Sequence, residues 1–212
     1  MVEISTDLSV LESPIRKKII QRILAQGGEI SYQQAVQAFG NIGGRLDYQF
    51  SVLVSDGLLE RAVRGKYRIS PSCIQELRNL FGIVSPIALI GGIGKDLSLL
   101  TDLSQALHKM SIVPSHRVVI TSPEIAQHLR EDTLIDQTHL EIIVFGFQDI
   151  LREKPREIKA AIQEWVFSHY LEYTIIADLT GGTKPVTIAL FDLGRQYRWQ
   201  LIYYSSRQLI WL

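Results

Sequence analysis

Five short apolar runs alternate with helical patterns through the last 130 or so residues, and this alternation is the strongest constraint on the fold. The runs are PIALI (86–90), RVVI (117–120), LEIIVFGF (140–147), YTIIA (173–177) and WQLIYYS (199–205). Segments with helical spacing lie between them, at about 97–110, 123–131, 155–169 and 184–197. The pattern predicts an α/β, Rossmann-like domain with a mainly parallel sheet and helices on both faces. In such sheets ligands bind at the carboxyl ends of the strands.

The first 70 residues have a different pattern. A helix with an apolar face is expected over 14–25, a second from Ser31 to Phe39, and a third from about Arg45 to Ser55. LLERAV and KYRIS then form a hairpin with four basic residues and no acid between positions 61 and 68. We therefore predict a small winged helix-turn-helix domain at 1–70, a helical connector at 71–82 and the ligand-sensing α/β domain at 83–212.

Composition excludes several classes of function. The 212 residues have no net charge and a single cysteine, so neither a strongly basic nucleic-acid binder nor a disulfide scaffold is indicated. The five histidines lack metal-ligand spacing, and we expect no metal and no cofactor. No signal peptide or membrane span is evident, and a cytoplasmic protein without membrane contact is expected.

The stretch ADLTGGTKPVTIAL joins the fourth strand to the following helix. Backbone N–H groups and the positive end of the helix dipole face outward at such a junction, which favours an anion. Its hydroxyls, glycines and ammonium suit phosphate or ribose, and the candidates are Thr180, Gly181, Gly182, Thr183 and Lys184. The alternative is a tight turn between strand and helix.

A second glycine-rich loop, IGGIGKDLS, follows the first strand. Asp96 stands where a P-loop needs Ser or Thr, and Leu97 stands where a dinucleotide fingerprint needs its third glycine. An ordinary ATP or nicotinamide site is therefore not expected. A simple glycine-rich turn is the alternative here.

The first 70 residues resemble the winged-helix domains of ArsR-like prokaryotic regulators, most clearly in LDYQFSVLVSDGLLERAVRGKYRIS. The resemblance implies that the third helix enters the major groove of double-stranded DNA and that the hairpin is the wing. It assigns DNA contacts to Arg45, Tyr48, Gln49, Ser51, Arg64 and Lys66. The alternative is a module that serves only in protein assembly.

The second half resembles the CRISPR-associated Rossmann-fold (CARF) domain, a sensor of cyclic oligoadenylates in type III CRISPR defence. The resemblance rests on DLTGGTK, on the loop after the first strand and on the order of elements. It implies a homodimer whose paired loops bind a cyclic oligoadenylate, and cyclic tetra-adenylate is the expected ring. By position, the ligand contacts would be Gly91, Gly92, Ile93, Gly94, Lys95 and Asp96 together with Thr180, Gly181, Gly182, Thr183 and Lys184.

Together the two resemblances imply a transcriptional regulator of type III CRISPR defence whose DNA affinity responds to cyclic oligoadenylate. The alternative is a metal-independent ring nuclease that cleaves the ring by attack of a ribose 2′-OH, with Lys184 stabilising the developing charge. In a third possibility the N-terminal half only mediates assembly.

Overall fold

The computed structural model describes residues 8–40, 45–62, 65–132, 139–145 and 155–212. The chain divides into two units, Met1–Val84 and Ser85–Leu212, each with its own apolar core. The segment 71–82, expected to be a connector, contains helix α4 (Ile74–Phe81), whose Ile74 and Leu77 pack into the core of the first unit.

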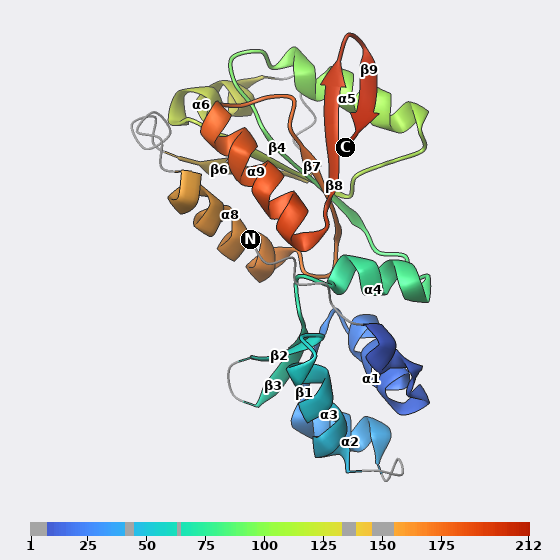
Figure 1. Ribbon diagram of the computed structural model, residues 1–212. Coiled ribbons are helices and arrows are strands. Elements are labelled where there is room, and N and C mark those ends of the chain that lie inside the picture. Colours follow the sequence, from blue (N-terminus) through green and yellow to red (C-terminus); the bar gives the residue numbers. More distant parts are fainter. Residues whose placement is uncertain (1–7, 41–44, 63–64, 133–138, 146–154) are drawn as a thin grey trace. The chain divides into compact units, whose positions relative to one another are not determined.

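The first unit combines helices with a small antiparallel sheet (Figure 1). After a short 3-10 helix, Leu8–Glu12, the order is α1 (Pro14–Ala25), β1 (Glu29–Ser31), α2 (Tyr32–Phe39), α3 (Leu46–Ser55), β2 (Leu59–Ala62), β3 (Lys66–Ile69) and α4. The strand order is β1-β3-β2, and both pairings are antiparallel. The predicted hairpin is thus present as β2 and β3, and β1 adds a strand that the sequence pattern did not predict.

Local sequence explains where these helices begin. Pro14 lies in the first turn of α1, where its missing N–H is not needed. Ser31 caps α2: its hydroxyl accepts from the N–H of Gln34, and the Gln34 side chain accepts from the N–H of Ser31. The expectation that Ser31 begins the second helix is confirmed.

The second unit is an α/β domain with a mainly parallel sheet, as predicted, and the sheet has six strands. The element order is β4 (Ile87–Gly92), α5 (Ser98–Lys109), β5 (His116–Thr121), α6 (Pro123–Glu131), β6 (Leu140–Val144), α8 (Pro155–His169), β7 (Thr174–Asp178), α9 (Lys184–Tyr197), β8 (Gln200–Ser205) and β9 (Gln208–Trp211). The strand order is β6-β5-β4-β7-β8-β9. All pairings are parallel except that of β8 with β9.

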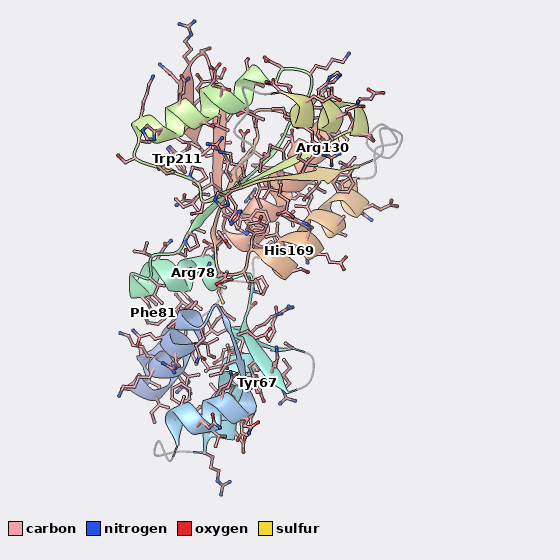
Figure 2. The ribbon with its side chains drawn as sticks, turned by 180° about the vertical axis from the view of Figure 1, so that it is seen from behind. Tyr67, Arg78, Phe81, Arg130, His169 and Trp211 are labelled. Carbon is pink, nitrogen blue, oxygen red and sulfur yellow. The ribbon has the colours of Figure 1, made fainter. Side chains whose placement is uncertain are left out.

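Apolar helices cover both faces of this sheet. Figure 1 shows α8 and α9 side by side over one face, where they pack on alternate residues of the strands such as Ala88 and Ile90. On the other face the intervening Leu89 packs against α5, and Val119 packs against α6. Figure 2 shows the molecule from this opposite side. Burial on both faces explains why the parallel strands are continuous apolar runs.

The chain order reverses at the centre of the sheet. From β4 the chain continues outward to β5 and β6, whereas β7, on the other side of β4, is followed by β8 and β9. The loops after β4 and β7 therefore leave neighbouring strands in opposite directions. Such a switch point is where open α/β sheets bind ligands, and both glycine-rich loops lie there.

The edge strand β9 was not predicted. Its hairpin turn consists of Ser206 and Arg207, which have φ values of 50° and 65°. Two left-handed residues match the twist of a two-residue hairpin, but glycine or asparagine normally occupies those positions. Among the helices that the structure describes, none is long and apolar enough to cross a membrane.

Candidate functional site

The two glycine loops are in backbone contact at the carboxyl ends of β4 and β7. A Cβ atom on Gly181 would collide with the carbonyl oxygen of Gly92, and one on Gly182 would lie 2.8 Å from the Gly92 Cα. A Cβ on Gly92 would in turn lie 3.0 Å from the Gly182 Cα. These three glycines are therefore required for the loops to pack, since any side chain would separate them.

This contact changes the interpretation of the glycines. They were expected to let a ligand approach the backbone, but the backbone that approaches Gly181 and Gly182 is that of the other loop. Gly182 also has a left-handed φ of 83°. Gly94 differs from these three, because a Cβ there would meet nothing within 4 Å. Open space at this end of the site thus begins beside Gly94.

The start of α9 presents unused hydrogen-bond donors. Within the part of the chain that the structure describes, no acceptor is bound by the N–H groups of residues 181–184. Thr183 is the N-cap of α9, yet its side chain does not cap the helix, and its hydroxyl oxygen is buried without a hydrogen-bond partner. Lys184 is exposed in the first turn. This arrangement of free N–H groups, a hydroxyl and an ammonium fits an anionic group.

Thr180 has a different environment from its neighbours. Its hydroxyl donates to Oδ1 of Asp178 and accepts from the N–H of Tyr204 at 2.7 Å. The same Oδ1 accepts from the Thr180 N–H at 2.9 Å. Thr180 therefore fastens the loop to β8, and its hydroxyl is already used within the protein.

Asp178, the last residue of β7, is the buried acid of the site. Burial raises the pKa of its carboxyl group, and the two hydrogen bonds from Thr180 lower that pKa in part. A Cβ on Gly91 would lie 3.0 Å from Oδ2 of Asp178, so glycine at 91 leaves room for the carboxyl group. A cavity of about 20 Å³, large enough for one water molecule, is lined by Gly91, Asp178, Ser104 and Arg117 among others.

Hydrogen bonds with the neighbouring strand β5 hold the loop after β4. The Ile93 carbonyl accepts from the Thr121 hydroxyl at 2.9 Å, and the Ile93 N–H donates to the Ile120 carbonyl. Asp96 accepts from the N–H and hydroxyl of Ser98, which orders the start of α5. Lys95 is exposed. Of this loop's predicted site residues, Ile93 and Asp96 have structural contacts, while Lys95 and Gly94 face open space.

Sequence reasoning did not assign Asp178 and Thr121 to the site. Both support loop residues from buried positions at the ends of strands. An acid directly before a Thr-Gly-Gly turn was a usable signal for Asp178, because Asp often accepts hydrogen bonds from the N–H two residues on. Thr121 gave no such signal, because its partner is 28 residues away.

The residues predicted to contact DNA have mixed environments in the first unit. Arg45 is the exposed N-cap of α3, Tyr48 is 62% exposed, and Ser51 is also exposed. Gln49 is half-buried, and its side-chain oxygen is buried without a partner. Arg64 lies outside the described residues. The exposed part of α3 thus has one cation and two uncharged polar or aromatic groups from the predicted set.

Ion pairs neutralise much of the charge of the hairpin. Lys66 contacts Glu29 on β1 at 2.6 Å. Arg68 makes two bonds of 3.1 and 3.0 Å to one carboxylate oxygen of Glu60. Lys66 can therefore contact a DNA phosphate only in competition with Glu29, which weakens the expected electrostatic attraction.

Comparison with known proteins gives similarity in structure only. No family model and no curated protein sequence matches the chain. Among solved structures, protein VC1899 from Vibrio cholerae is similar with a TM-score of 0.48 and 19% identity, over 59% of this chain and 33% of that protein.

Two further similar structures contain a cyclic ligand. Can2 from Sulfobacillus thermosulfidooxidans in complex with cyclic tetra-adenylate has a TM-score of 0.45 and 18% identity, over 59% of this chain and 34% of that one. Enterococcus italicus Csm6 bound to cyclic hexa-2'-fluoro-hexa-dAMP has a TM-score of 0.45 and 15% identity, over 58% and 34%. The chain thus spans about a third of the length of these three proteins.

The glycine contact predicts different effects at two glycines of the site. Gly181→Ala should lower the free energy of unfolding by about 1–3 kcal/mol, because its Cβ collides with backbone that cannot move aside easily. Gly94→Ala is the matched control and should be near neutral, since its Cβ enters open space. Urea denaturation of the two variants tests this, and equal losses of stability would show that the loops are not closely packed.

Asp178 predicts a pH-dependent difference in stability. Its raised pKa means that the folded protein holds the proton more tightly than the unfolded chain, so stability is lost as pH rises above about 4 through the folded pKa. Asp178→Asn keeps an Oδ1 acceptor but removes the buried charge. Its stability relative to the natural protein should therefore increase between pH 4 and pH 7, as measured by denaturation at each pH.

The control for that comparison is Asp178→Ala, which loses the acceptor. Relative to the Asn variant it should cost about 1–3 kcal/mol at every pH, because neither variant titrates at this position and the N–H and hydroxyl of Thr180 lack their partner in the Ala variant. A relative stability of the Asn variant that falls towards pH 7 would mean instead that the carboxylate charge is stabilised, for example by Arg117 in the adjoining cavity.

Proposed function

We propose that the second unit binds a cyclic oligoadenylate at the two glycine loops and that the protein is a ligand-responsive regulator. The observation that carries the proposal is the group of unused donors at the start of α9, at the switch point of the sheet. The unpaired Thr183 hydroxyl costs about 1–3 kcal/mol in the free protein. A phosphate that draws this hydroxyl outward would recover that energy on binding.

The identity of the ligand comes from the DLTGGTK resemblance to CARF domains. In this proposal Thr180 holds the loop through its two internal hydrogen bonds, while Thr183, Lys184 and the N–H groups contact the ligand. A cyclic tetra-adenylate has four phosphates and internal symmetry. One loop provides too few donors for all of them, so we propose a homodimer that presents the same loop twice.

For the first unit we propose a winged helix-turn-helix. The order α1-β1-α2-α3-β2-β3 and the three-stranded antiparallel sheet support this assignment. DNA would meet α3 through Arg45, Tyr48 and Ser51, and the hairpin through Lys66 after release from Glu29. Ligand and DNA binding would be coupled reciprocally, so each would change the affinity of the other by the same factor.

The first prediction for this function concerns Lys184. In isothermal titration calorimetry with cyclic tetra-adenylate, Lys184→Ala should lose about tenfold in affinity, about 1.4 kcal/mol, because a charge-assisted phosphate contact is removed. Arg195→Ala removes the same charge from the last turn of α9 and should bind normally. For a dimeric site the same titration should give a stoichiometry of one ring for two chains.

Three outcomes of this experiment would contradict parts of the proposal. Equal affinities of the Lys184 and Arg195 variants would remove Lys184 from the site. A stoichiometry of one ring for each chain would exclude a shared dimeric site. Recovery of linear product from the titrated sample, lost in the Lys184 variant, would favour the ring nuclease over the sensor.

The second prediction concerns the competition between Glu29 and DNA. Glu29→Gln should free Lys66, tighten binding to a mixed-sequence DNA duplex and steepen the salt dependence by about one phosphate contact. Glu12→Gln makes the same change in net charge at an exposed position outside the hairpin. Fluorescence anisotropy over a range of salt concentrations distinguishes the two, and equal effects would show that Lys66 makes no phosphate contact.

A further inference from the structure

A groove separate from the glycine loops lies between α5 and the β8–β9 hairpin. Its volume is about 660 Å³, within the range of about 300–1,000 Å³ usual for small-molecule sites. Helix α5 contributes its outer residues from Asp102 to Met110, and the hairpin contributes Tyr204 to Leu209. None of these side chains belongs to the site proposed above, although the backbone N–H of Tyr204 donates to Thr180 there.

Five polar side chains line the groove. No hydrogen bond or ion pair involves these side chains among the residues that the structure describes. The five are Asp102, Gln105, Lys109, Arg207 and Gln208. The aromatic ring of Tyr204 and the side chain of Leu209 provide apolar surface beside them. Two cations, one carboxylate and one exposed apolar side chain, Met110 at 49%, thus converge on one groove.

The turn that holds Arg207 is conformationally unfavourable. Ser206 and Arg207 both have left-handed φ values, which cost energy for residues with side chains. Glycine or asparagine would form the same two-residue turn at less cost. An arginine at the second position instead gives the groove its second cation, opposite Lys109 on α5.

We propose that this groove binds a nucleoside monophosphate. Lys109 and Arg207 provide charge-assisted donors for a dianionic phosphate, and Arg207 can bind it through two N–H groups. Tyr204 and Met110 provide apolar surface for a base, as nucleotide sites commonly do. Asp102 and Gln105 have acceptor and donor groups for a base edge, and an exocyclic amine suits Asp102. Adenosine monophosphate meets all three requirements.

The test is calorimetric titration of the full chain with 5′-AMP, in comparison with adenosine and inorganic phosphate. We expect 5′-AMP to bind and each of the two fragments to bind at least about tenfold more weakly, because each engages one half of the groove. Arg207→Gly should weaken 5′-AMP binding at least about tenfold and raise the melting temperature. Ser206→Gly is the matched control: it also relieves a left-handed residue, so it should raise the melting temperature while leaving affinity unchanged.

Further variants separate this groove from the glycine-loop site. Lys184→Ala should bind 5′-AMP normally, and Arg207→Gly should bind cyclic tetra-adenylate normally, so each site can fail without the other. Three results would overturn the groove: no binding of 5′-AMP, loss of 5′-AMP binding in the Lys184 variant, or equal affinities of the Ser206 and Arg207 variants. If inorganic phosphate binds as tightly as 5′-AMP, the groove is only an anion site, and the proposal of a nucleotide ligand is wrong.

Discussion

The backbone contact between Gly92 and the Gly181–Gly182 pair determines the geometry of the α/β domain at its ligand-binding end. Because β4 and β7 are neighbours, their loops must leave the sheet within a few ångströms of each other. Three glycines make that possible, and the contact places the first turn of α9 beside the end of β4. The direction in which the α9 donors point is therefore a consequence of packing between loops, which a side chain at any of the three positions would change.

A second layer of polar contacts holds this arrangement against the sheet. The Asp178 carboxyl group, the Thr180 hydroxyl and the Tyr204 N–H form one chain of hydrogen bonds from β7 to β8. On the other side Thr121 supports Ile93. These hydrogen bonds tie the two loops to β5, β7 and β8. Burying the Asp178 carboxyl group is unfavourable for its charged form, which is a cost of holding the loop from inside the domain.

The sequence predicted the sheet but not every contact within the sites. The parallel strands and the helices of the α/β domain followed from the sequence, because short continuous apolar runs alternated with segments of regular helical spacing. The β9 strand was not predicted, because Ser206 and Arg207 give no turn signal although they adopt a hairpin conformation. The ion pair of Lys66 joins residues 37 apart and follows from no local pattern. Glycines indicated a close backbone approach, but a sequence alone cannot tell whether a ligand or another loop makes it.

The two units differ in how their charges are used, and this difference bears on what each can recognise. In the first unit the cations of β3 are matched by carboxylates on β1 and β2, so β3 attracts a polyanion weakly. A phosphate would have to replace a carboxylate to contact these cations. In the second unit the unused groups at α9 are mostly backbone N–H dipoles, and none of them is bonded to an acceptor among the residues that the structure describes. Preorganised dipoles of this kind favour a small anion that fits their spacing over a polyanion that offers only charge, because affinity then depends on geometry at short range. The groove beside α5 differs from the hairpin of the first unit in the same way. Among the described residues Lys109 and Arg207 have no ion pair, so they can bind a phosphate without first breaking one.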